Sequence, residues 1–177
     1  PHDVSFIAHS TTQATNALLE GDVSKVGIIG MAKGIESVRA RSQTDIMDIE
    51  VASGKTIKTS YGFLDVSECL DREKVRLLIE EMIKEKCEAL VAAQAFSTDD
   101  PLCENSVKKV ASELSFPAVA TSEISGLYGL KTRTTTALVN ASILPLMMKV
   151  ATLTEESVKA AGISAPLMVM RSDGGVI

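Results

Sequence analysis

Hydrophobic and charged positions alternate most regularly around residues 75–83, where they predict an amphipathic helix. Apolar side chains recur there at intervals of three and four residues, at Val75, Leu78, Ile79, Met82 and Ile83. Charged residues fill most of the positions between them, so one face of the predicted helix is apolar and the other is polar. Asp71 stands just before this segment and is expected to cap its first turn.

Short apolar runs predict buried strands between further helices. Strands are expected at residues 6–8, 26–29, near 63, 89–96, 117–120 and 167–170. Helices are expected at residues 14–20, 35–41 (a short helix or turn), 100–114, 132–150 and 154–162. Strands that are apolar at successive positions are typical of a sheet covered on both faces. The alternation therefore predicts an α/β fold, with a parallel or mixed sheet and helices on its faces.

Residues 49–66 predict a β-hairpin that ends in a strand, because Ala-Ser-Gly-Lys at residues 52–55 has β-branched residues on both sides. This hairpin is the best candidate for a boundary within the chain. We therefore expect residues 1–60 to form a small N-terminal αβ part and residues 61–177 to form a larger αβ part.

The helix expected at residues 132–150 is apolar on nearly every side after residue 136, so it should be buried, and Pro145 is expected to bend it. Arg133, Thr136 and Asn140 fall on one face and form a polar stripe. Asn140 is expected to be buried, and a buried amide needs hydrogen-bond partners. The stripe is either a structural set of bonds to neighbouring loops or a secondary functional site.

Composition and charge exclude several classes of partner. The 177 residues carry a formal net charge of −5, with 3% aromatic residues and no tryptophan, which disfavours nucleic acid as a partner. No apolar run approaches the roughly 20 residues that cross a bilayer, so no membrane contact is expected. Three cysteines at wide spacing (Cys69, Cys87 and Cys103) are typical of a reduced, cytoplasmic protein. No Cys/His pair has zinc-ligand spacing, so no metal site is predicted.

Two polar segments follow predicted strands, where α/β proteins gather their ligands. The first contains His9, Ser10, Thr11, Thr12 and Asn16, whose hydroxyls, imidazole and helix-start amides suit an anion or a ring amide. The second contains Ser172, Asp173, Gly174 and Gly175, and its glycines allow close backbone approach to a ligand. The structural alternatives are a well-capped helix for the first segment and a simple turn for the second. The catalytic residues themselves are not identified.

Three segments resemble signatures of the hydantoinase A/5-oxoprolinase family, in family order and spacing across nearly the whole chain. Residues 9–20 (HSTTQATNALLE) resemble the family's HGTTVATNALLE, although Ser10 replaces its glycine. Residues 129–147 are similar to GEYERTSTAVLNAYVGPVM through Arg133-Thr134, Thr136-Ala137, Asn140-Ala141 and Pro145. Residues 165–175 are similar to APLLVMQS[ND]GG, with Asp173 where asparagine is common. The chain is most similar to an N-methylhydantoinase A-like subunit.

The resemblance implies an ATP-dependent hydrolase with Mg²⁺ on an actin-like (ribonuclease H-like) fold. Such an enzyme opens a cyclic amide, a hydantoin or 5-oxoproline, by phosphorylating the amide oxygen before water attacks. It also implies a second subunit or domain of the hydantoinase B type. The same family implies a different reaction as an alternative, in which the ATPase subunit serves a carboxylase of acetone or acetophenone. A third alternative, from another class, is a non-catalytic subunit-docking domain.

The family's two glycine-rich D-x-G-G-T nucleotide loops do not occur in these residues. We therefore interpret the chain as an internal fragment of the N-terminal region, cut off before the second nucleotide loop. No cofactor site is expected within it, and the fragment alone is expected to turn over neither ATP nor a hydantoin ring.

Overall fold

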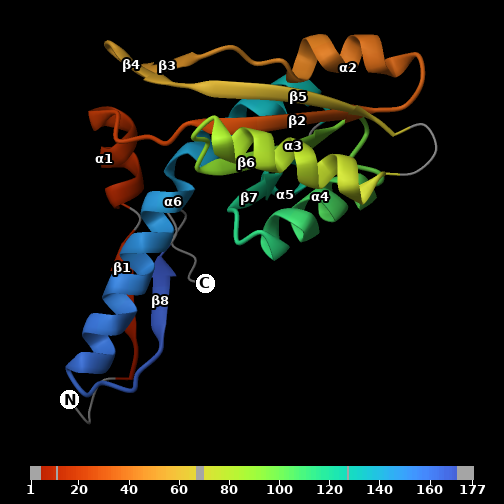
Figure 1. Ribbon diagram of the computed structural model, residues 1–177. Helices are drawn as coiled ribbons and strands as arrows, with labels where there is room; N and C mark the ends of the chain where they lie inside the picture. The colour runs from red at the N-terminus through yellow and green to blue at the C-terminus, as the bar shows by residue number, and fades with distance from the viewer. Residues whose placement is uncertain (1–4, 11, 67–69, 127, 171–177) are drawn as a thin grey trace.

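The computed structural model describes residues 5–10, 12–66, 70–126 and 128–170, and its centre is a four-stranded parallel sheet (Figure 1). The strands are β2 (Val26–Ala32), β5 (Thr59–Asp65), β6 (Ala89–Gln94) and β7 (Ala118–Ala120). Their order across the sheet is β5-β2-β6-β7, and every neighbouring pair is parallel. This arrangement confirms the predicted α/β class.

Helices cover both faces of this sheet, which explains why its strands are apolar at successive positions. α3 (Arg72–Lys84) and α4 (Leu102–Glu113) pack on one face, where Ile29 and Leu90 belong to their core. α6 (Leu130–Ala160) packs on the other face, where Ile28 and Val91 meet Leu138. Neighbouring strand residues therefore belong to different cores, because successive side chains of a strand point to opposite faces.

The amphipathic helix predicted around residues 75–83 is confirmed as α3. Asp71 is its N-cap, and the Asp71 carboxylate accepts hydrogen bonds from the main-chain N–H groups of Glu73 (3.0 Å) and Lys74 (3.4 Å). Val75, Ile79 and Met82 are buried against the sheet. Ile83, the last residue of the predicted apolar face, is 40% exposed.

The segment between β2 and β5 holds α2 (Glu36–Thr44) and a hairpin of β3 (Ile49–Ala52) with β4 (Lys55–Ile57), as predicted. The strand after the hairpin, β5, pairs directly with β2. Strands from both sides of residue 60 thus belong to one sheet. The division of the chain at that residue stays a prediction.

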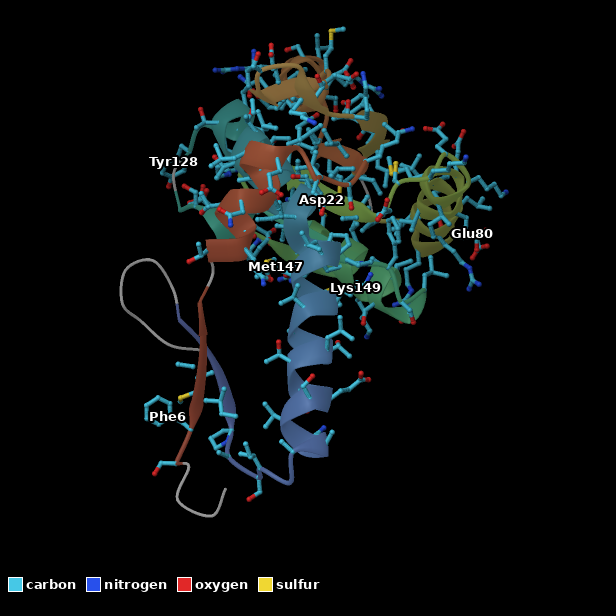
Figure 2. All side chains as sticks on the ribbon, turned by 90° about the vertical axis from the view of Figure 1, so that its left-hand side faces the viewer. Phe6, Asp22, Glu80, Tyr128, Met147 and Lys149 are labelled. Carbon is cyan, nitrogen blue, oxygen red and sulfur yellow. The ribbon has the colours of Figure 1, made fainter. Side chains whose placement is uncertain are left out.

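A second, smaller parallel sheet lies away from the first. It consists of β1 (Ile7–Ser10) and β8 (Leu167–Met170), and α1 (Thr12–Glu20) begins just after β1. This pair and the C-terminal half of α6 extend together from the main body (Figures 1 and 2). α1 ends where predicted, since Gly21 has a φ of +73° and Asp22 donates its N–H to the carbonyl of Ala17 (2.9 Å).

The two helices predicted at residues 132–150 and 154–162 are a single helix, α6, with Pro145 in its interior. The expected break was wrong because Thr154 does not act as a cap. Its hydroxyl donates to the carbonyl of Val150 (2.8 Å), four residues earlier in the same helix. Among the described residues, α6 is the one helix long and apolar enough to cross a membrane by length and composition alone. Its N-terminal half instead packs on the sheet, as a core helix does, and its C-terminal half is largely uncovered.

Candidate functional site

The polar motif at residues 9–16 begins with the last two residues of β1, and residues 171–175 come directly after β8 in the sequence, and these two strands pair with each other. β1 and β8 run parallel, and their register matches Ile7 with Leu167 and Ser10 with Met170. The carboxyl ends of both strands therefore lie at the same end of the small sheet, close to the start of α1 (Figure 1). Segments far apart in the sequence are thus brought together at the kind of edge where α/β proteins bind ligands.

The structure describes four of the residues predicted to bind substrate or phosphate. His9 and Ser10 are the last two residues of β1, Thr12 is the first residue of α1, and Asn16 lies one turn further along the helix. The side chains of Thr12 and Asn16 are exposed. The other predicted residues lie outside the described part of the chain: Thr11, Ser172, Asp173, Gly174 and Gly175. The role of each of these residues stays a prediction.

The start of α1 is electrostatically suited to an anion. The first turn of a helix presents main-chain N–H groups without partners in the helix, at the positive end of its dipole. The first turn of α1 contains no acidic residue, so nothing there competes with a bound anion. No lysine or arginine occurs before Lys25 in the sequence, so the groups that this segment itself offers to an anion are main-chain amides and hydroxyls.

The predicted polar stripe on α6 is divided between the interior and the surface. Arg133 is 1% exposed. Its guanidinium donates hydrogen bonds to three oxygens, one on the last residue of β6 and two on the segment that follows. The acceptors are the Thr98 hydroxyl (2.8 Å), the Ser97 hydroxyl (3.1 Å) and the Gln94 carbonyl (3.3 Å). Arg133 therefore fixes the segment that follows β6 against α6.

The other two members of the stripe are exposed. The Asn140 side chain donates a hydrogen bond to the main-chain carbonyl of Thr136 (2.8 Å), and the Thr136 hydroxyl donates to the carbonyl of Thr132 (2.9 Å). Asn140 therefore has a hydrogen-bond partner, as expected, but the prediction that Asn140 is buried was wrong. The apolar residues around it led to that error, because the side of α6 that carries Asn140 is not covered by the sheet.

A buried carboxylate that the sequence analysis missed organises the ends of two strands. Glu104 on α4 is 0% exposed, and its carboxylate accepts four hydrogen bonds. The donors are the main-chain N–H of Gln94 (2.9 Å), the Thr121 hydroxyl (2.6 Å), and the main-chain N–H (3.0 Å) and hydroxyl (2.6 Å) of Ser122. One side chain thus joins the carboxyl ends of β6 and β7 to α4.

The sequence did contain a signal for Glu104. Val107, Val110 and Ala111 form the buried face of α4, and Glu104 lies three residues before Val107 on that same face. A charged residue in phase with an apolar face indicates a buried carboxylate that has partners.

The described residues offer neither an evident metal centre nor an activated thiol. No group of three or more His, Cys, Asp or Glu side chains in the described ranges is arranged to hold a metal ion. Cys87 is buried, and burial raises the pKa of its thiol above the ordinary value, which disfavours the nucleophilic thiolate. Cys103 is half-buried, and Cys69 lies outside the described residues.

Comparisons with known proteins identify the family. A family model described as the hydantoinase/oxoprolinase N-terminal region matches residues 1–115, and one described as hydantoinase/oxoprolinase matches residues 133–177. No curated protein sequence matches the chain. An ATP-dependent caprolactamase from Pseudomonas jessenii is structurally similar over 98% of this chain, with a TM-score of 0.67 and 20% identity. A nucleotide-free acetone carboxylase, from work on ATP-dependent acetone carboxylation, is similar over 98% of this chain, with a TM-score of 0.62 and 16% identity.

At these identities the structural likeness concerns the fold. The chain covers 28% of each of these two solved chains, so it spans less than a third of their length. The two family models together extend over most of the residues, and the first alone covers more than half of them. The chain belongs to the hydantoinase/oxoprolinase family.

Proposed function

We propose that the protein containing this chain is an ATP-dependent hydrolase that opens a cyclic amide, such as a hydantoin or 5-oxoproline. Membership of the family and the fold shared with an ATP-dependent caprolactamase support this proposal. The observation that carries it is the parallel pairing of β1 with β8, which brings the strands before both polar motifs to one edge.

The chemistry requires an activated amide, because resonance makes an amide carbonyl a poor electrophile. ATP would transfer a phosphoryl group to the amide oxygen and release ADP, and the carbon of the resulting phosphorylated imidate is electrophilic enough for water to add. The ring C–N bond of this adduct then breaks and the nitrogen leaves as the amine, which gives an acyl phosphate. A second water hydrolyses the acyl phosphate, so that a carboxylate, an amine and phosphate remain. Electrostatic stabilisation by fixed donors is the largest contribution that a protein makes to such steps.

The residues at the edge formed by β1 and β8 suit one part of this reaction, the stabilisation of negatively charged oxygens. The N–H groups in the first turn of α1, with the Thr12 hydroxyl beside them, suit a phosphoryl oxygen or an amide oxyanion. Asn16 would contact the substrate from one turn further along the helix. For Ser172, Asp173, Gly174 and Gly175 the support is the family resemblance, and binding of Mg²⁺ and of the nucleotide's remaining phosphates would fall to residues elsewhere in the protein.

The shared fold with acetone carboxylase favours a second candidate, in which the ATP chemistry serves the carboxylation of a ketone. The identities of 20% and 16% do not separate the two reactions. We infer a hydantoinase B-like partner subunit in either case, and a cytoplasmic location.

The test is a comparison of substrates on the intact protein with its partner subunit. Release of ADP is measured with Mg-ATP and hydantoin, 5-oxoproline or caprolactam, and in parallel with acetone and bicarbonate. We expect ADP release that depends on a cyclic amide and is matched by ring-opened product. Release that requires acetone and bicarbonate would establish the carboxylase instead.

A matched pair of variants tests the site. Thr12→Val removes a hydroxyl at the first residue of α1, and Thr15→Val removes one from the same exposed helix further from its start. We expect Thr12→Val to lower kcat at least tenfold and Thr15→Val to leave kcat nearly unchanged. Equal activity of the two variants would contradict the assignment of the α1 terminus.

A further inference from the structure

The four-stranded sheet has a point where the direction of its strand order reverses. The first of its strands in the chain is β2, the next (β5) pairs on one side of β2, and the third (β6) pairs on the other side. The gap between the carboxyl ends of β2 and β6 is therefore a topological switch point. Open α/β sheets bind ligands in the crevice outside the strands at such a point.

A cavity of about 200 Å³ lies at this switch point. Ala32 and Lys33 line it from the end of β2, Val66 from the end of β5, and Gln94 and Phe96 from the end of β6. A second cavity of about 220 Å³ adjoins it, since the two share Phe96 and two further lining residues. This edge lies across the sheet from α1, so the cavity is separate from the edge formed by β1 and β8 (Figure 1).

Gln94, which lines this cavity, has a buried side-chain oxygen without a partner among the described residues. Gln94 is 9% exposed, and no described residue donates a hydrogen bond to its side-chain carbonyl, Oε1. The main chain of Gln94 is held on both sides, because its N–H donates to Glu104 (2.9 Å) and its carbonyl accepts from Arg133 (3.3 Å). The main chain that carries this side chain is thus held in place, and a buried acceptor without a donor is costly.

The wall beside Gln94 is a strained aromatic residue. Phe96 has a φ of +61°, a conformation that bulky side chains rarely adopt, and its side chain is 58% exposed. The turn after β6 holds it there, since the Phe96 carbonyl accepts from the N–H groups of Asp99 (3.0 Å) and Asp100 (3.1 Å). Such strain concentrates where proteins bind ligands, because elsewhere it lowers stability without a benefit.

The chemistry of the lining selects a class of ligand. Ala32, Val66, Ala95 and Phe96 are apolar, and the charges of Lys33 and Glu36 have opposite signs. A polyanion such as a nucleotide is disfavoured, because Glu36 occupies the first turn of α2 and the volume is small. An uncharged molecule with an apolar face, an N–H donor for Gln94 and a carbonyl that Lys33 can reach satisfies the lining.

We propose that the switch-point cavity is a second binding site, which takes a small uncharged amide such as a lactam, an imide or a ureide. The ligand donates its N–H to Gln94 Oε1 and lays its apolar face against Phe96. The ligand class follows from the lining residues, and the site goes beyond the reaction proposed above because it lies at a different sheet edge and requires no ATP.

Calorimetric titration of the intact protein without ATP tests this site, with hydantoin and 2-pyrrolidone as probes and succinate as the charged control. We expect saturable binding of the amides and none of succinate. Gln94→Met removes the acceptor at similar volume and should weaken amide binding roughly five- to tenfold. Asn105→Met removes an exposed amide on α4 and should leave the affinity unchanged.

A second variant separates binding from folding. Phe96→Gly removes the aromatic wall and relieves the positive φ, so it should weaken amide binding while Tm stays the same or rises. Unchanged affinity in both Gln94→Met and Phe96→Gly would overturn the site, and so would the absence of saturable amide binding. Amide binding without ATP-dependent ring opening would instead refute the proposed reaction and leave the site standing.

Discussion

Replacement of Glu104 by glutamine should lower the stability of this protein much more than the same replacement at the exposed Glu113. The Glu104 carboxylate is fully buried and accepts hydrogen bonds from two main-chain N–H groups and two hydroxyls, with donor–acceptor distances of 2.6–3.0 Å. Hydroxyls can rotate to meet a changed partner. The N–H groups of Gln94 and Ser122 cannot, because they only donate.

The magnitude follows from this difference. In Glu104→Gln one side-chain oxygen becomes an NH₂ group that faces a main-chain N–H, so one buried donor loses its acceptor at a cost of about 1–3 kcal/mol. The remaining hydrogen bonds also lose a charged acceptor, which brings the expected total to about 2–4 kcal/mol. For a chain of this size that corresponds to a fall in Tm of roughly 5–15 °C. Such a loss is a large part of the typical stability of about 5–15 kcal/mol.

Thermal melts followed by circular dichroism measure the effect, and the same helix supplies the control. Glu113 on α4 is exposed and pairs with Arg72 at 2.8 Å, so Glu113→Gln should leave Tm nearly unchanged. A Glu104→Gln protein that melts within about 2 °C of the wild type would refute the argument from buried donors. Equal falls in both variants would show that the net charge of α4, and not burial, determines the result.

Three further predictions concern packing, reactivity and pH. Gly30→Ala should lower stability by about 1–3 kcal/mol, because an added Cβ would collide with the Thr44 hydroxyl and lie within 3.0 Å of Phe63 and Tyr61. Gly126→Ala meets nothing within 4 Å and should be neutral in the same melts. Native Cys87 should react with iodoacetamide far more slowly than half-buried Cys103 at pH 8, as peptide mass spectrometry will measure, because burial raises its pKa; equal rates would contradict this. The pKa of Asp48 is lowered mainly by the hydrogen bond from a neighbouring lysine, so its contribution to stability exists above the unfolded-state pKa and disappears as pH falls through the folded-state value. Asp48→Asn should therefore lower Tm at pH 7, and the difference in Tm should shrink as pH falls below the unfolded-state pKa. A difference that does not change with pH over this range would contradict the assignment.

Local patterns predicted most of the elements, because each depends on a few neighbouring residues. The apolar spacing and the cap at Asp71 specify α3, and β6 is apolar at its first five positions, with all six of its residues buried. The same reasoning failed inside α6. Thr154 and the two acidic residues after it have the composition of a helix start, and only the bond from the Thr154 hydroxyl back to Val150 distinguishes them from one.

The sequence marks the candidate residues, but it does not specify how the segments that carry them are arranged. Polar residues after two predicted strands indicated the segments at residues 9–16 and 171–175. Each of these indications depends only on neighbouring residues in the sequence. That β1 and β8 pair with each other is a contact between opposite parts of the chain, and no spacing within either segment specifies it. Strand pairing over such a separation depends on which apolar faces remain uncovered once the rest of the chain has packed.

The switch-point cavity could not be predicted from the sequence either. Its lining residues belong to no motif, since alanine, valine and phenylalanine beside a strand are typical of any core. The position becomes meaningful only through the order β5-β2-β6-β7, because in that order the chain after β2 and the chain after β6 lead to strands on opposite sides. Gln94 is then set apart by its hydrogen bonds: Glu104 and Arg133 hold its main chain, while its side-chain oxygen has no donor among the described residues. The two buried charges therefore do more than stabilise the end of β6, because they also hold the main chain of the residue whose side-chain oxygen would contact a ligand.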